Sequence, residues 1–175
     1  MGDAPSATSV LQATQVNDPD TVDAAAWLRF SDDGVAAAAA LLGQTGLAAG
    51  ARWAAVYVYG NGGEDPAPLV PYAADPDPSV RLIAAAALIA RGRGEGFAPA
   101  VDALTDTSMV TGTLPPCPSW VLAAQTLVRA TARADLGPPL DADDRLRRLS
   151  QDAWRRWLTD ERPALHFDAT TGLWS

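Results

Sequence analysis

The feature that most constrains this chain is a short alanine-rich segment that recurs at the length of a helix pair. The segment RWAAVYVYG begins at Arg52 and RLIAAAALI begins at Arg81, so the same pattern returns after 29 residues. A third copy, WVLAAQTLV, begins at Trp120 after a longer spacing of 39 residues. Repeats of this length are typical of stacked helical units, none of which can bury both of its faces alone. The sequence therefore predicts three equivalent inner helices in one stack.

The second copy is bounded at both ends by residues that start and stop helices. Asp77 is placed to cap the N-terminus, Pro78 suits a first turn that needs no amide donor, and Gly92 suits a left-handed C-terminal cap. Between them, apolar residues lie on more than one side of the helix, and many are alanine, as at Ala85 and Ala87. Alanine lets neighbouring backbones approach closely. We therefore predict that this helix lies between two layers.

Each inner helix is preceded by an apolar segment that predicts an outer helix. These segments begin at Val35, Ala67 and Phe97. One more helix is expected from Asp20, ahead of the stack, and a helix rich in arginine and tryptophan is expected from Arg145. Almost no strand is predicted outside the C-terminal tail. The expected fold class is therefore all-α, built from antiparallel helix pairs.

The last predicted helix has the pattern of a cap for the open end of the stack. Trp154 and Trp157 are spaced i, i+3, and Leu146, Leu149 and Leu158 extend the same apolar stripe. Large aromatic side chains are usually buried to a substantial degree. We therefore expect these tryptophans to pack against the last repeat.

The predicted helices divide the chain into three parts. Residues 1–19 are polar and expected to be flexible, with a short helix around residues 10–16 as the alternative. Residues 20–158 form the predicted helical repeat domain, which includes its C-terminal cap helix. Residues 159–175 form a tail that packs on the last repeat, with a small hairpin expected within residues 166–174.

Charge is distributed unevenly along the chain. The net charge is −8, and the residues before Arg81 hold ten acidic residues against two arginines, so this front half accounts for all of it. An acidic surface attracts a basic protein and disfavours nucleic acid, whose binding depends on a dominant basic face. The chain has no lysine, which excludes Schiff-base chemistry and a phosphate-loop lysine.

Membrane and redox signals are absent from the sequence. No run of eighteen apolar residues occurs, and the first thirty residues lack the basic start and apolar centre of a secretory signal. We therefore expect a cytoplasmic protein that does not bind membranes. The only cysteine, Cys117, excludes an internal disulfide and a cysteine-based zinc site.

The residues from about 30 to 131 resemble the bacterial HEAT-like repeat. The resemblance is carried by an outer helix, then DPDPSVRLIAAAAL, then GFAPAVDALTD. It implies a short right-handed α-solenoid in which an aspartate, a valine and an arginine brace successive repeats, here Asp75, Val80 and Arg81. The other copies depart from the pattern, because Gly46 stands at the aspartate position before Arg52 and Trp120 replaces the arginine. We therefore expect one complete bracing unit and no continuous ladder.

No constellation of residues in the sequence predicts catalysis. His166 is the only histidine, and a pair with Cys117 would need an orienting group and an oxyanion site that no motif announces. Asp141, Asp143 and Asp144 could hold a magnesium ion, but they directly precede a helix and are expected to cap it. We assign no catalytic, cofactor-binding or metal-ligating residue.

The favoured function is a non-catalytic protein–protein interaction module, such as an adaptor or an immunity-type inhibitor, that presents an acidic surface to a basic protein. The candidate contacts are Asp32, Asp33, Glu64, Asp65 and Trp120. One alternative is a structural subunit of a larger assembly, including a homo-oligomer. The other is implied by the resemblance alone: a bilin lyase or isomerase, or an alkylpurine DNA glycosylase. The charge balance disfavours DNA, and no motif beyond the repeat supports bilin chemistry.

Overall fold

The computed structural model describes residues 5–15, 17–110, 116–161 and 164–175, and these residues are mostly helical. Two small two-stranded sheets accompany the helices, so the all-α prediction is confirmed. None of the described helices is both long enough and apolar enough to cross a membrane. The α-helices are α1 (Ala7–Ala13), α2 (Pro19–Trp27), α3 (Asp32–Leu42), α4 (Ala49–Gly62), α5 (Pro78–Ala90), α6 (Phe97–Asp102), α7 (Ser119–Thr131) and α8 (Asp144–Glu161).

Short 3-10 helices and strands connect these elements. The 3-10 helices are η1 (Leu28–Phe30), η2 (Ala67–Ala74), η3 (Gly94–Gly96), η4 (Ala103–Thr105) and η5 (Ala134–Leu136). Strands β1 (Met109–Val110) and β2 (Cys117–Pro118) pair antiparallel, as do β3 (Phe167–Asp168) and β4 (Leu173–Trp174). The β3–β4 pair confirms the predicted terminal hairpin, whereas the β1–β2 pair was not expected.

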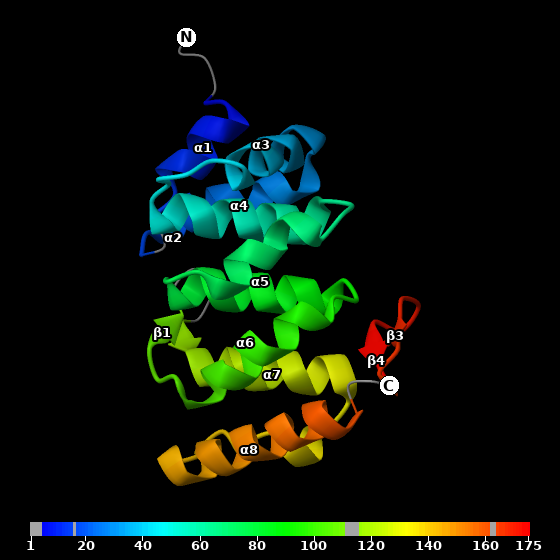
Figure 1. The fold of residues 1–175 in the computed structure, drawn as a ribbon. Coiled ribbons are helices and arrows are strands. Elements are labelled where there is room, and N and C mark those ends of the chain that lie inside the picture. Colours follow the sequence, from blue (N-terminus) through cyan, green and yellow to red (C-terminus); the bar gives the residue numbers. More distant parts are fainter. Residues whose placement is uncertain (1–4, 16, 111–115, 162–163) are drawn as a thin grey trace.

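The three predicted inner helices lie one after another in the order of the sequence. Figure 1 shows α4, α5 and α7 crossing the view in successive layers, with α8 below them. Helix α4 packs on α3 and α5, and α5 packs on α7. The spatial order of these helices therefore follows their order in the sequence.

Helix α5 begins and ends as its flanking residues predict. The Asp77 carboxylate accepts hydrogen bonds from the backbone N–H groups of Ser79, at 2.9 Å, and Val80, at 3.2 Å. Pro78 occupies the first helical position, and Gly92 has a φ of +74° just beyond the last turn. The Arg93 N–H then donates to the Leu88 carbonyl at 2.8 Å, which closes the C-terminal end.

The alanines of α5 let it pack against two separate hydrophobic cores. Ala84 belongs to the core shared with α3 and α4, and Ala85 belongs to the core shared with α6, α7 and α8; both are fully buried. The backbone at Gly96 approaches α5 so closely that a Cβ there would clash with the Ala85 carbonyl oxygen. The prediction that α5 lies between two layers is therefore confirmed.

Replacing Ala85 with leucine is expected to lower the free energy of unfolding by about 1–3 kcal/mol, because the added carbons have no room between the layers. Ala90→Leu is the matched control, since Ala90 is exposed on the same helix and should tolerate the change. Urea unfolding followed by circular dichroism measures both. Equal stabilities of the two variants would contradict the tight packing at Ala85.

Two of the three predicted outer helices are less regular than expected, whereas the one predicted from Val35 forms α3. Residues 67–74 form the 3-10 helix η2, and Pro71 lies inside it. Proline has no N–H to donate and its ring clashes with the preceding turn, so an α-helix cannot continue through this position. Helix α6 is short and passes into η4 at Ala103. In these two cases a long inner helix follows a short or irregular outer segment.

The N-terminal segment differs from the flexible tail that was predicted. Residues 7–13 form α1, which packs on α3 and α4, and Leu11 is fully buried there. The fully buried Leu11 is what anchors this otherwise polar segment. Residues 1–4 and 16, which also fall in the predicted tail, lie outside the described residues.

The closing helix α8 caps the stack with only part of its predicted stripe. Trp154 is fully buried and its ring packs edge-on against that of Trp157, with centroids 5.4 Å apart. Leu146 and Leu149, however, are exposed. These two leucines were predicted to be buried and are not, because α8 is the last layer and the described chain places no further helix over them.

Candidate functional site

A buried ion pair joins the layers of α4 and α5. The Nε of Arg52, in α4, lies 2.8 Å from one carboxylate oxygen of Asp75, and its Nη2 lies 2.9 Å from the other. Asp75 is only 7% exposed and also accepts a hydrogen bond from the Asp77 N–H at 2.8 Å. The hydrogen bonds that Arg52 donates to Asp75 hold the pKa of its guanidinium above its ordinary value. Asp75 therefore joins the start of α4 to the segment before α5 through its bonds with Arg52.

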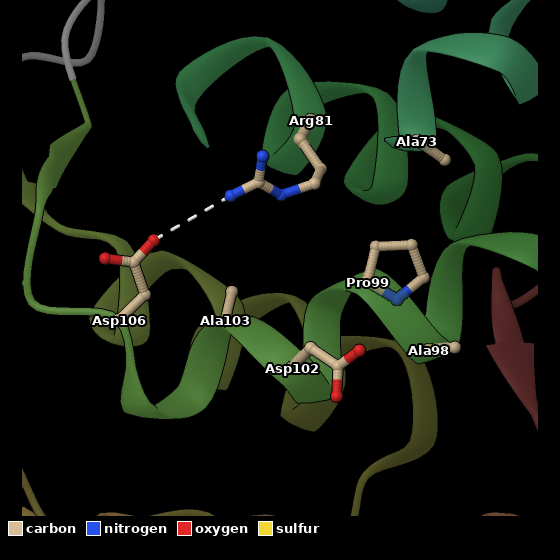
Figure 2. A pocket seen from close by; sticks show the side chains of 7 residues that line it. All are labelled: Ala73, Arg81, Ala98, Pro99, Asp102, Ala103 and Asp106. Atoms are coloured by element: carbon tan, nitrogen blue, oxygen red, sulfur yellow. Dashed lines mark ion pairs between the residues drawn. The ribbon is translucent and has the colours of Figure 1, made fainter. Parts of the chain in front are cut away.

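Arg81 makes the corresponding contact one layer further along. Its Nη1 donates to the Asp75 carbonyl at 2.6 Å, and its Nη2 lies 4.0 Å from the carboxylate of Asp106, at the end of η4. Figure 2 shows the Arg81 side chain pointing toward Asp106 across a pocket. Val80, the third predicted bracing residue, is fully buried in the first core.

Trp120 continues this row without an ion pair. The guanidinium carbon of Arg147, in α8, lies 5.4 Å from the centroid of the Trp120 ring. Arg147 also donates to the Ala142 carbonyl at 2.7 Å, just as Arg52 donates to the Leu47 carbonyl and Arg81 to that of Asp75. Side-chain contacts therefore lie near the helix starts from Arg52 to Arg147, and the row contains ion pairs at Arg52 and Arg81 but none at Trp120.

Trp120, predicted to contact a partner protein, has little surface exposed for such a contact. Its side chain is buried, because Arg147 and the neighbouring layer cover it. The role of Arg147 was missed, although its signal is present: DADDRLR from Asp141 matches DPDPSVR from Asp75 at both aspartates and at the arginine. Asp143 caps α8 through the Leu146 N–H at 2.8 Å, as Asp77 caps α5.

A cavity of about 290 Å³ lies between the α5 layer and the α6 layer. Its polar groups come from Arg81, Asp102 and Asp106, and Ala98 and Pro99 of α6 contribute apolar surface, as Figure 2 shows. Asp102 already forms a 2.8 Å ion pair with Arg155, and Arg81 already bonds to backbone carbonyls. The charged groups of this cavity therefore serve the stack itself.

The four acidic side chains predicted to meet a partner are all exposed. Asp32 and Asp33 lie in the first turn of α3, and Glu64 and Asp65 follow the end of α4. The two sites lie on the same side of the α3–α4 pair, because Gly62 near the end of α4 contacts Val35 near the start of α3. Within the described residues, none of these four carboxylates forms an ion pair.

The loop that carries Glu64 and Asp65 is fixed to the scaffold. The Arg91 guanidinium donates to the backbone carbonyl of Gly63 and, at 2.6 Å, to that of Glu64. Asp65 accepts a hydrogen bond from the Ala67 N–H at 2.9 Å. This acidic surface, defined as Asp32, Asp33, Glu64 and Asp65, is therefore held in place by contacts to its backbone, and in the described residues none of its carboxylates forms an ion pair.

The two residues considered for nucleophilic chemistry are far apart. Cys117 lies in β2, directly before the start of α7, whereas His166 precedes β3 and pairs through its backbone with Ser175. The hairpin packs near the end of α7, and a helix of 13 residues is about 20 Å long. Figure 1 shows β1 and the β3–β4 hairpin on opposite sides of the molecule. The structure does not bring Cys117 and His166 together.

The aspartates before α8 bond to the helix. Asp143 caps it, as described above, and Asp144 pairs with Arg147. In the part of the chain that the structure describes, no group of three or more histidine, cysteine, aspartate or glutamate residues is arranged to hold a metal ion. The expectation that these aspartates cap the helix is therefore confirmed for Asp143.

Comparisons of the chain with protein-family models, with curated proteins and with solved structures found no match.

Proposed function

We propose that this chain is a non-catalytic protein-interaction module whose acidic surface binds a basic protein. The observation that carries the proposal is that Asp32, Asp33, Glu64 and Asp65 are exposed on one side of α3 and α4 without an ion pair in the described structure. Unpaired carboxylates on a fixed backbone attract a cationic partner and speed its association.

We further propose that the module is a short right-handed α-solenoid of HEAT-like repeats. The successive layers of α4, α5 and α7 support this proposal, as do the side-chain contacts that repeat at Arg52, Arg81 and Trp120. A solenoid builds a binding surface from several repeats while its core stays continuous. Such a scaffold suits an adaptor or an inhibitor that neutralises a cationic enzyme.

Neutralising Asp32 and Asp33 together, as Asp32→Asn and Asp33→Asn, is expected to weaken capture of the partner about tenfold at low salt, since each exposed charge contributes up to about 1 kcal/mol. The measurement is capture from an extract of the native source over a series of salt concentrations. Asp160→Asn with Glu161→Gln is the matched control, because it makes the same charge change at the exposed end of α8.

Capture that is unchanged by salt and by the Asp32 and Asp33 substitutions would overturn the electrostatic proposal. So would recovery of a partner that is itself strongly acidic. The control variant should behave as the unmodified chain does, which separates the position of the charge from the net charge of the protein.

A second candidate function, a subunit of a larger assembly, is favoured by the apolar side chains at the C-terminal end of the stack. Leu140 is 80% exposed, and Leu146 and Leu149 are also exposed on neighbouring turns. Exposed apolar groups that gather in one place are typical of surfaces that associate. Light scattering on the purified chain, before the capture experiment, distinguishes a self-associating subunit from a monomeric module.

A further inference from the structure

The most exposed aromatic residues of the described chain lie side by side at the end of α2. Trp27 is 72% exposed and Phe30 is 68% exposed, and their ring centroids are 5.8 Å apart. By contrast, Trp53 and Trp154 are fully buried. Neither core requires Trp27 or Phe30, so their packing in the folded chain does not explain them. Adjacent exposed aromatic rings are typical of the centre of a binding surface.

Carboxylates border this aromatic pair on both sides. Asp20, Asp23 and Trp27 are spaced i, i+3, i+7 and all are exposed, so they share one stripe of α2. Asp32 and Asp33 lie two and three residues after Phe30, in the first turn of α3. Within the described residues, none of these four aspartates forms an ion pair. The rim of the aromatic pair is therefore negatively charged.

Arg29, which lies between Trp27 and Phe30 in the sequence, contacts Tyr57 and the Phe30 ring and forms no ion pair with these aspartates in the described residues. Arg29 Nη1 donates to the Tyr57 hydroxyl at 2.7 Å and to the Ala26 carbonyl at 3.2 Å. Its guanidinium carbon lies 4.3 Å from the centroid of the Phe30 ring. The chain itself thus shows a guanidinium resting on one of these rings, while the Trp27 ring remains largely open.

We propose that Trp27 and Phe30, with the rim of Asp20, Asp23, Asp32 and Asp33, form an aromatic–acidic surface that docks an arginine-bearing apolar segment of a partner protein. The inference rests on the proposed function and names the chemistry of the partner. Arginine suits both parts of the surface, because its guanidinium stacks on aromatic rings and pairs with carboxylates. A second copy of this chain fits poorly, because two such rims would bring like charges together.

The local potential can be tested on the protein alone with ionic quenchers of tryptophan fluorescence. Quenching by each ion is measured relative to its quenching of a neutral free tryptophan derivative, since iodide is intrinsically the stronger quencher. On this relative scale we expect caesium to quench Trp27 several times more effectively than iodide, because the aspartates attract the cation and repel the anion. Trp27→Phe should remove most of the caesium-sensitive emission. Asp20→Asn with Asp23→Asn should raise iodide quenching of Trp27. A relative iodide quenching equal to or above that of caesium would overturn the acidic rim.

Binding is tested with two synthetic peptides of equal length and charge, one alternating arginine with leucine and the other alternating arginine with serine. The Trp27→Ser, Phe30→Ser double variant should bind the arginine–leucine peptide at least tenfold more weakly than the unmodified chain does. It should bind the arginine–serine peptide only about two- to threefold more weakly, because that peptide loses guanidinium stacking but has no apolar side chain to lose contact. Leu140→Ser is the matched control, since it removes an equally exposed apolar side chain from another surface. Calorimetry measures affinity, and circular dichroism checks that each variant is folded.

The outcomes separate this inference from the proposed function. If the aromatic variant binds both peptides as the unmodified chain does, while Asp32→Asn with Asp33→Asn weakens both, the aromatic docking is wrong and the acidic module stands. If neither set of substitutions changes binding, both proposals are overturned. If light scattering shows a dimer that the aromatic substitutions dissociate, the surface joins two copies of the chain and the inference is overturned.

Discussion

Replacing Asp75 with alanine is expected to lower the free energy of unfolding by about 2–4 kcal/mol, somewhat less than the cost of about 3–5 kcal/mol for removing one partner of a fully buried ion pair. The change leaves the Arg52 guanidinium without its two carboxylate bonds and the Asp77 N–H without its acceptor. Arg52 keeps 22% of its side chain exposed, so water compensates part of the loss. Urea unfolding followed by circular dichroism measures the effect.

Asp102→Ala is the matched control for this prediction. Asp102 pairs with Arg155 at 2.8 Å, the same distance as the Arg52–Asp75 pair, but both side chains are mostly exposed. An exposed pair contributes about 0–1 kcal/mol, so this variant should be nearly as stable as the unmodified chain. A double-mutant cycle with Arg52→Ala then isolates the coupling between Arg52 and Asp75. Equal effects of Asp75→Ala and Asp102→Ala would refute the bracing role of Asp75.

Replacing Trp174 with alanine is expected to cost about 3–5 kcal/mol of stability, the usual range for removing a large buried aromatic side chain. Trp174, in β4, packs edge-on against Phe97 with ring centroids 5.2 Å apart and contacts Phe167 at 5.4 Å. Its indole Nε1 also donates to the Ile89 carbonyl at 3.0 Å. The substitution therefore removes a hydrogen bond and leaves a cavity beside the second core.

Thermal unfolding measures the stability of the Trp174→Ala variant, and Trp27→Ala is the control for the loss of an exposed tryptophan. Trp27 is largely exposed, so its removal should change the stability by less than about 1 kcal/mol. If the hairpin only frays and the main transition of Trp174→Ala is unchanged, the tail is an appendage and the prediction is wrong. A lowered main transition shows that the tail belongs to the cooperative unit.

The local features of the fold could be predicted because they are written in short stretches of sequence. The alanine-rich inner helices, the Asp77 cap and the terminal hairpin all depend on residues within a few positions of one another. The shortened outer segment at residues 67–74 could also have been predicted, since Pro71 stands inside it.

The contacts between layers were harder to predict. Arg52 pairs with Asp75, which lies 23 residues further along the chain. The repeat pattern instead predicts a partner on the N-terminal side of the arginine, where this chain has Gly46. Trp120 is predicted to contact a partner, but Arg147 covers its ring. The segment that contains Arg147 is interpreted from its sequence only as part of a capping helix. A side chain that pairs with the next layer leaves no periodic signal within its own helix.

The exposure of Trp27 and Phe30 could not be derived from their sequence pattern. Both residues are apolar and next to helical segments, which is equally typical of core residues. Only the three-dimensional packing shows that α4 is covered at this point by Leu28 and Val22, so that the aromatic rings are left outside.

Among the described helices, α5 contributes buried side chains to both hydrophobic cores. Val80, Ala84 and Leu88 complete the first core, while Leu82, Ala85 and Ile89 complete the second. If α5 unfolds, both cores are exposed to water. Unfolding of one core that displaces α5 therefore also removes buried contacts from the other core. We therefore expect the two cores to unfold in one transition, so that a destabilising substitution in either core lowers the stability of both.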